Sequence, residues 1–136
     1  MILVDLNVVL DVVQKREPYF AASAAVLERI VLKEIEGAIS AHAVTTIHYI
    51  VERYRDAPTA NQAVDWLLLY FVVAPVGYRE LSRARALGWR DFEDAVVVAA
   101  AEASGCDVIV TRNVKDFDKS PVSVVTPEEY LLSSIQ

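Results

Sequence analysis

The sequence predicts a single α/β domain in which a mainly parallel sheet of about five strands lies between layers of helices. Three observations lead to this fold class. Short β-branched and aliphatic runs alternate with segments that have the apolar spacing of helices, an order that requires crossover connections and hence parallel strands. The chain has 136 residues, the length of one domain. Hydrophobic residues make up 54% of it, enough to form a core.

Five short apolar runs are predicted to be strands. The first, Ile2-Leu3-Val4, has the β-branched and aliphatic character of a strand covered on both faces, and polar residues follow it at once. In order along the chain, the predicted strands cover residues 2–4, 38–41, 71–76, 108–111 and 122–125.

The segments between these strands have helical spacing and recognisable ends. Pro18 stands at the opening of a helix, where proline is tolerated, and the glycines at 37, 88 and 105 are predicted to be C-terminal stops. In order, the predicted helices cover residues 8–14, 18 to the stop at 37, 43–55, about 58–69, 78–87 and 91–104, with a short last helix from Pro127.

Composition and charge exclude several classes of protein. Cys106 is the only cysteine, which excludes an internal disulfide framework and suits a reducing cytoplasm. Residues 1–10 lack the basic leader and cleavage site of a signal peptide, and no apolar run approaches the ~20 residues of a membrane span. The net charge of −6 argues against nucleic-acid binding by the whole surface, but not against a nuclease whose clustered carboxylates hold metal ions.

Acidic residues are predicted to converge at one edge of the sheet. Asp5 directly follows the first strand, and Asn113 and Asp116 follow the fourth. Asp91 and Asp94 lie in the first turn of the helix that leads into the fourth strand, so they are expected at the same edge. In open parallel sheets, ligands bind beyond the carboxyl ends of the strands.

Such a group of carboxylates favours a divalent cation. Unpaired carboxylates that lie close together repel and raise each other's pKa, and Mg²⁺ or Mn²⁺ removes that cost because these ions prefer carboxylate oxygen. The same ions activate water and polarise phosphodiesters. We therefore expect Asp5, Asp94 and Asp116 to bind the metal, in a site that also includes Asp91 and Asn113.

Each residue also has a purely structural interpretation. Asp5 can cap the first helix, although that helix is expected to begin near Asn7, itself a good cap with a possible role around the metal site. Asp91 and Asp94 have the arrangement of a helix capping box. Asp116 can be an ordinary loop residue, and the two histidines, which lack metal-ligand spacing, are assigned to structure or surface. Only the joint pattern favours a catalytic site.

Three motifs resemble those of the PIN domain family, in particular its VapC-type ribonucleases. They are a strand that ends in Asp-Leu-Asn at 5–7, an aspartate that opens an alanine-rich helix at 94, and Thr-Arg-Asn at 111–113 followed by Asp-Phe at 116–117. The resemblance extends over the whole chain. It implies a three-layer α/β/α fold and an Mg²⁺- or Mn²⁺-dependent endoribonuclease, often the toxin of a toxin–antitoxin pair. It also implies a cytoplasmic homodimer held by an antitoxin protein.

Two positions depart from the family pattern. A glutamate is usual on the helix after the second strand, where this chain has Thr46, and the fourth acidic position is Asn113. Both changes are expected to weaken metal binding. Thr46 and Thr111 are retained, with Asn7, as candidates for positions around the metal ligands. For RNA binding, the nearby cations Arg112 and Lys115 are the candidates.

Two alternative functions remain open at this stage. The first is a PIN fold that has lost catalysis and binds RNA or protein, which the two departures favour. The second is a Mg²⁺-dependent phosphatase or receiver domain, which needs a nucleophilic aspartate and commonly a second one close by, whereas Asn7 stands two residues after Asp5.

Overall fold

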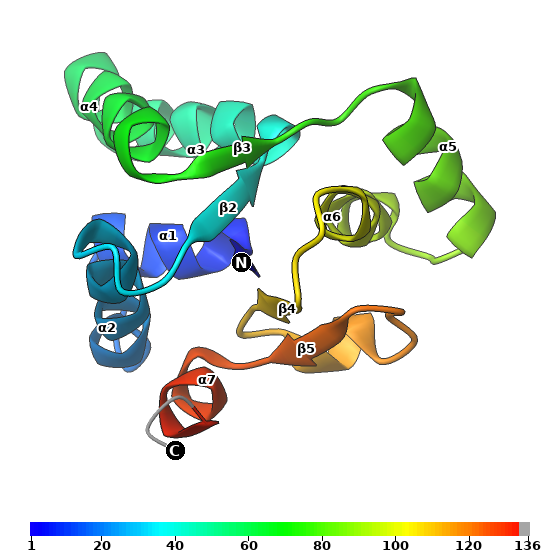
Figure 1. Ribbon diagram of the computed structural model, residues 1–136. Helices are drawn as coiled ribbons and strands as arrows, with labels where there is room; N and C mark the ends of the chain where they lie inside the picture. The colour runs from blue at the N-terminus through cyan, green and yellow to red at the C-terminus, as the bar shows by residue number, and fades with distance from the viewer. Residues whose placement is uncertain (134–136) are drawn as a thin grey trace.

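The computed structural model describes residues 1–133 and contains a five-stranded parallel sheet between two layers of helices (Figure 1). The strand order is β3-β2-β1-β4-β5, and every neighbouring pair is parallel. The predicted fold class and strand number are thus confirmed. The strands are β1 (Ile2–Val4), β2 (Gly37–Ser40), β3 (Val72–Ala74), β4 (Val108–Val110) and β5 (Ser123–Val125).

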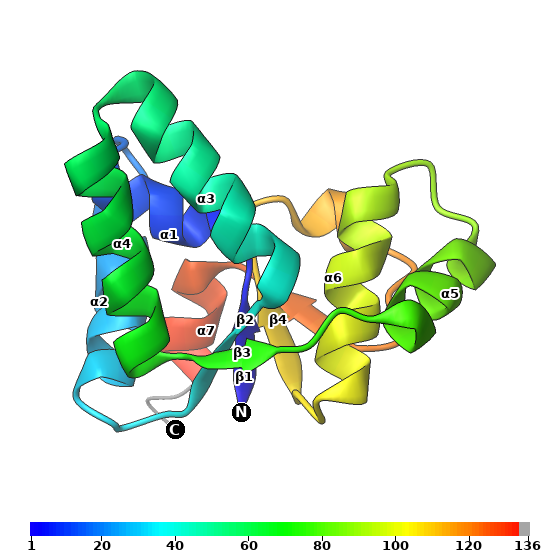
Figure 2. The same cartoon turned by 90° about the horizontal axis from the view of Figure 1, so that it is seen from above.

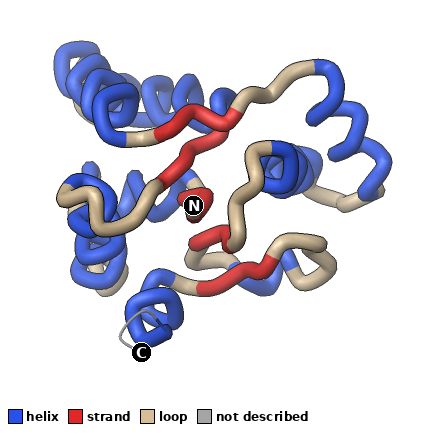
Figure 3. The backbone as a smooth tube through the Cα atoms, in the orientation of Figure 1, coloured by secondary structure: helices blue, strands red, loops and turns tan. Residues whose placement is uncertain are grey.

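The helices divide between the two faces of the sheet. Helices α1 to α4 and α7 pack on one face, and α5 and α6 cover the other, as the tube in Figure 3 and the view in Figure 2 also show. The helices are α1 (Leu6–Val13), α2 (Phe20–Val31), α3 (Ala41–Tyr54), α4 (Ala57–Tyr70), α5 (Tyr78–Leu87), α6 (Phe92–Ala103), a 3₁₀ turn η1 (Val114–Phe117) and α7 (Pro127–Ser133).

The pleat of β1 explains why both faces need a cover. Ile2 and Val4 belong to the core on the α1 side, whereas Leu3, between them, belongs to the core on the α6 side. All three side chains are buried, so this strand has no polar face. Its carboxyl end therefore delivers the next residue, Asp5, to the edge of the sheet between the two layers.

The predicted stop of the second helix at Gly37 was wrong. Helix α2 ends at Val31, because Lys33 takes the left-handed conformation (φ 61°) and its backbone N–H bonds to the carbonyl of Ile30. Gly37 instead pairs with Ile2 in the sheet. A Cβ there would overlap the side chain of Ile30, so glycine permits the close approach of β2 to α2.

Other boundaries differ by smaller amounts. The first helix begins at Leu6 rather than near residue 8, since Asp5 and not Asn7 is its cap. The third strand ends at Ala74, before Pro75, which has no N–H to donate. Gly88 (φ 69°) and Gly105 (φ 72°) follow α5 and α6 as predicted.

None of the helices in residues 1–133 is both long and apolar enough to span a membrane.

Candidate active site

Asp5 lies at the end of β1 and is held by three hydrogen bonds. Its Oδ1 accepts from the backbone N of Leu6 at 2.8 Å, which makes Asp5 the N-cap of α1. Its Oδ2 accepts from Oγ1 of Thr111 at 2.8 Å and from Nδ2 of Asn7 at 3.1 Å. The side chain is buried, with 7% of its surface exposed. The capping interpretation and the expected place at the sheet edge are therefore compatible.

Thr111 and Asn7 connect Asp5 to the segment after β4. Thr111 is completely buried, and its Oγ1 accepts from the backbone N of Asn113 at 3.1 Å. Nδ2 of Asn7 lies 3.4 Å from the same hydroxyl, and Oδ1 of Asn7 accepts from the backbone N of Arg112 at 3.5 Å. Two residues predicted to lie around the metal ligands are thus in contact with Asp5.

Asp94 interacts with acidic residues from three parts of the chain. Burial, together with the negative charges of Asp91, Asp5 and Asp116 and a hydrogen bond with Asp91, raises the pKa of Asp94 to about 7. Asp91 caps α6, since its Oδ1 accepts from the backbone N of Asp94 at 3.1 Å. The carboxyl groups at the end of β1, at the start of α6 and in η1 therefore lie close enough to influence one another's protonation.

The structure adds two residues that the sequence analysis did not select. His42, in the first turn of α3, and Glu93 both interact electrostatically with Asp5, and burial raises the pKa of Asp5 above its ordinary value. Burial lowers the pKa of His42, whose two ring nitrogens are buried without a hydrogen-bond partner among residues 1–133. The position of His42 directly after a strand was the available signal, because the carboxyl ends of β1 and β2 share one edge.

Other predicted residues lie apart from this cluster or are engaged elsewhere. Oγ1 of Thr46 donates to the carbonyl oxygen of His42 at 3.2 Å. Nε of Arg112 donates to Oδ2 of Asp11 at 2.8 Å, and its guanidinium lies 4.1 Å from the ring centroid of Tyr19. Asn113 and Lys115 are exposed at the start of η1.

The ligand set fits a hydrated divalent cation better than a tightly coordinated one. Among residues 1–133, no three histidine, cysteine or acidic side chains are grouped closely enough to hold an ion by themselves. Asp5, Asp94 and Asp116 therefore do not form a closed cage of ligands. Mg²⁺ commonly keeps several waters and uses one or two carboxylates together with substrate phosphate, so this open arrangement suits it. Burial and the repulsion between the carboxylates raise the pKa of Asp94, and a cation at this place would offset both effects.

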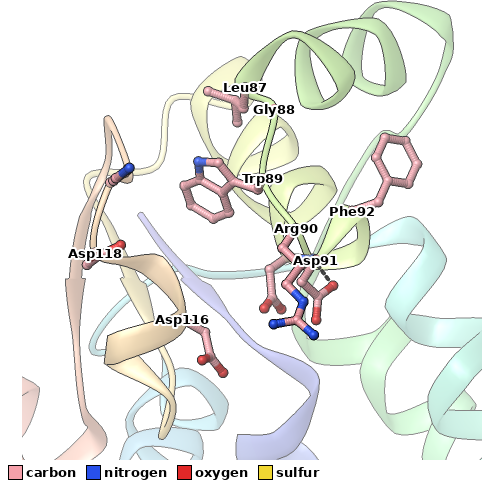
Figure 4. A pocket seen from close by; sticks show the side chains of 10 residues that line it. Leu87, Gly88, Trp89, Arg90, Asp91, Phe92, Asp116 and Asp118 are labelled. Atoms are coloured by element: carbon pink, nitrogen blue, oxygen red, sulfur yellow. Dashed lines mark hydrogen bonds between the residues drawn. The ribbon is translucent and has the colours of Figure 1, made fainter.

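A cavity of about 710 Å³ opens beside the carboxylates (Figure 4). The connection between α5 and α6 forms one wall, and η1 with the residues after it forms the other. Its lining residues are Leu87, Gly88, Trp89, Arg90, Asp91, Phe92, Asp94, Asp116, Asp118 and Lys119. A volume of this size is typical of sites that bind small molecules or parts of a polymer substrate.

The fold is shared with several solved structures, among them a toxin–antitoxin complex and a toxin. A toxin–antitoxin complex from Klebsiella pneumoniae superposes with a TM-score of 0.71 at 23% identity, over 93% of this chain and 98% of that one. FitAcB from Neisseria gonorrhoeae gives 0.70 at 22% identity, over 94% and 99%. VapC20 from Mycobacterium tuberculosis, described as a sarcin–ricin loop cleaving toxin, gives 0.65 at 16% identity, over 80% and 87%.

The sequence comparisons agree with this fold. Residues 1–115 match the family described as the PIN domain. This range includes every strand except β5 and four of the five predicted site residues. None of the curated proteins compared with the chain matches it. The match over residues 1–115 shows that the chain belongs to the PIN domain family.

Proposed function

We propose that this protein is an endoribonuclease that hydrolyses RNA phosphodiester bonds with Mg²⁺ or Mn²⁺, and that it is the toxin of a toxin–antitoxin pair. One observation carries the proposal: Asp94 is partly buried beside the carboxylates of Asp91, Asp5 and Asp116, and this burial and repulsion raise its pKa to about 7. Strongly perturbed carboxyl groups beside a cavity are characteristic of functional sites. Membership in the PIN family supports this activity over the phosphatase or receiver alternative.

The residues of the cluster have separable roles in this proposal. Asp5 is the rigid member, because Thr111, Asn7 and the first turn of α1 fix both of its oxygens. Asp94 titrates near neutral pH in the absence of metal, and it gives up its proton when it binds the ion. A bound divalent ion supplies positive charge that polarises the phosphodiester and assists attack by water.

Two more residues complete the proposed site around η1. Asn113, exposed at the start of η1, offers an amide oxygen but no charge. Lys115, exposed in η1 itself, can contact an RNA phosphate. Arg112 remains a candidate for the same role through the part of its guanidinium that Asp11 does not engage.

An antitoxin partner is supported by the neighbours and by the surface of α3 and α4. The structure from Klebsiella pneumoniae is a toxin–antitoxin complex, and the one from Rickettsia felis is VapBC2 bound to a DNA fragment from their promoter. In this chain, four large apolar side chains on α3 and α4 are more than half exposed: Tyr49, Tyr54, Leu68 and Leu69. Exposed apolar side chains on neighbouring helices favour a protein interface. We propose a homodimer held by an antitoxin in the cytoplasm.

Cleavage of labelled single-stranded RNA in the presence of Mn²⁺ tests the nuclease proposal. We expect cleavage by the wild type and a loss of about 100-fold or more in Asp5→Asn and Asp94→Asn. Asp65→Asn, an exposed position on α4, is the matched control and should cleave like the wild type. Equal cleavage by all four proteins would point to a contaminating nuclease.

A binding module is the second candidate, and two observations favour it. Thr46 replaces the glutamate usual in the family, and the described residues contain no ready group of three metal ligands. Such a protein would bind the RNA without cleaving it under any metal condition. Measurement of RNA binding by fluorescence anisotropy beside the cleavage assay separates the two candidates.

A further inference from the structure

The cavity beside the carboxylates has an aromatic wall, which bears on the substrate if the proposed nuclease function holds. Trp89 lies in the connection between α5 and α6 and lines the cavity. Figure 4 shows its indole ring directed toward the space between this connection and η1, with Asp118 across from it and Asp116 near the base of the cavity. The ring thus lies on the same side of the cavity as the helix that provides Asp94.

The indole is held in place without being enclosed. Trp89 and Phe117 form an edge-to-face pair, with their centroids 5.9 Å apart and their planes at 82°. In such a pair Phe117 covers at most one face of the indole. Phe117 itself is buried, so it provides a fixed support, whereas Trp89 is only partly buried. Trp89 also packs against the two hydrophobic clusters on the α6 side of the sheet, and the part of its ring that stays exposed lines the cavity.

The charges around the cavity favour an uncharged ring over a phosphate. Four of the lining residues are aspartates, and only Arg90 and Lys119 are cationic. Where no bound ion offsets this charge, the carboxylates repel a phosphate, whereas the amino groups of a nucleobase can donate hydrogen bonds to them. Both cations line the cavity and are exposed, so either can contact a phosphate of the same strand.

We propose that the cavity binds an unpaired RNA base, stacked on Trp89, adjacent to the phosphodiester that the carboxylates engage. Stacking on an aromatic side chain requires a base that is free of its helix, as in single strands, loops and bulges. A base that is stacked and paired within a duplex cannot take this place. Trp89 is a specificity-determining residue, separate from the groups proposed for catalysis.

Intrinsic fluorescence tests the stacking directly, because the chain has only two tryptophans. Trp66→Phe leaves Trp89 as the only tryptophan, and Trp89→Phe leaves only Trp66. Trp66 lies in α4 and packs against Tyr70 and Phe71. Both changes are made in Asp5→Asn protein, which prevents cleavage and leaves the cavity lining intact. A fluorescein-labelled 12-nucleotide RNA is titrated with Mg²⁺ present, while anisotropy and tryptophan emission are followed together.

We expect the emission of Trp89 to be quenched over the same RNA concentrations at which anisotropy rises, and the emission of Trp66 to stay constant. RNA binding with unchanged Trp89 emission would overturn the stacking proposal. If the wild type still cleaves RNA in that case, the proposed nuclease function stands. Absence of both binding and cleavage would overturn both.

Base removal from the RNA provides a second test that does not depend on how a variant folds. An abasic nucleotide is placed at each position of the oligonucleotide in turn. We expect one position, next to the cleaved bond, at which the loss weakens binding about tenfold, the effect of removing one stacked base. Trp89→Leu should show the same loss with intact RNA and no further loss with the abasic RNA, whereas Trp89→Phe should lose less.

Tyr78→Leu is the matched control, since Tyr78 is an aromatic side chain of α5 that is 86% exposed and does not line the cavity. It should bind intact RNA as the wild type does. Equal sensitivity of wild type and Trp89→Leu to every abasic position would contradict the proposal.

Discussion

Arg112 and Asp11 form an ion pair whose acidic member is completely buried, with Nε of Arg112 2.8 Å from Oδ2 of Asp11. The same oxygen accepts from Oγ of Ser23 at 3.1 Å, and the guanidinium of Arg112 lies over the ring of Tyr19. One arginine thus connects the segment after β4 to α1 and to the beginning of α2. Its backbone N also donates to Asn7, next to Asp5, so the ion pair is part of the support of the candidate site.

Removal of Arg112 should therefore destabilise the protein before it affects RNA binding. In Arg112→Ala the charge of Asp11 stays buried without its partner, and we expect the free energy of unfolding to fall by about 3 kcal/mol. Urea denaturation measures this, with Lys115→Ala, an exposed neighbour, as the control that should retain full stability. If Arg112→Ala is as stable as the wild type but binds RNA more weakly, Arg112 is a substrate contact instead.

The hydroxyl of Thr111 should matter more than its size. Thr111→Val keeps the shape but removes the donor to Asp5 and the acceptor for the backbone N of Asn113, all within a buried region. We expect a loss of about 1–3 kcal/mol in the free energy of unfolding and reduced RNA cleavage, because the carboxylate of Asp5 loses its fixed orientation. Thr111→Ser, which keeps the hydroxyl, should stay close to the wild type in both assays. Full activity in Thr111→Val would contradict a positioning role.

Asp94→Asn should make the metal-free protein more stable at high pH. Folding raises the pKa of Asp94 from 3.8 to about 7. The carboxyl group of Asp94 therefore binds a proton more tightly in the folded protein than in the unfolded chain. The resulting stabilisation is complete below pH 3.8 and is lost as the pH rises through 7. Because the side chain is partly exposed and solvent weakens the effect, we expect the loss in the free energy of unfolding to be on the order of 1–2 kcal/mol.

Thermal denaturation in EDTA at pH 5 and pH 8 measures this effect. The wild type should lose stability between the two values relative to Asp94→Asn, which carries no charge at either pH. Asp65→Asn should follow the wild type, because Asp65 is exposed on α4. Parallel behaviour of wild type and Asp94→Asn would mean that burial and the neighbouring carboxylates do not raise the pKa of Asp94 in solution.

The carboxylate cluster could be predicted because strand ends carry positional information. Asp5 and Asp116 follow strands that lie side by side, and Asp94 begins the helix that returns to the same edge. The sequence order alone therefore places these three residues near one another. The distances between their oxygen atoms depend on side-chain orientation, and the structure arranges them more openly than a preformed metal site.

Other features of the structure could not be predicted, because they depend on contacts or conformations that the neighbouring sequence does not indicate. Asp11 and Arg112 are 101 residues apart, and neither has a neighbour that reveals the pairing. The end of α2 is set by a lysine in the left-handed conformation, a place where local preference alone favours glycine or asparagine. His42 is different, because its place after β2 was an available signal; its proximity to Asp5 follows from the pairing of β1 with β2.

Binding of a divalent ion at neutral pH should release protons. Because the pKa of Asp94 is about 7, about half of the metal-free molecules carry a proton there at pH 7, and the positive charge of the ion drives it off. We expect release of about half a proton per Mg²⁺ bound at pH 7, and an affinity that increases from pH 6 to pH 8. Isothermal titration calorimetry in phosphate and in Tris measures this, since the two buffers take up protons with different heats. Asp94→Asn should give the same heat in both buffers, and an equal heat for the wild type would exclude Asp94 as the group whose proton the ion displaces.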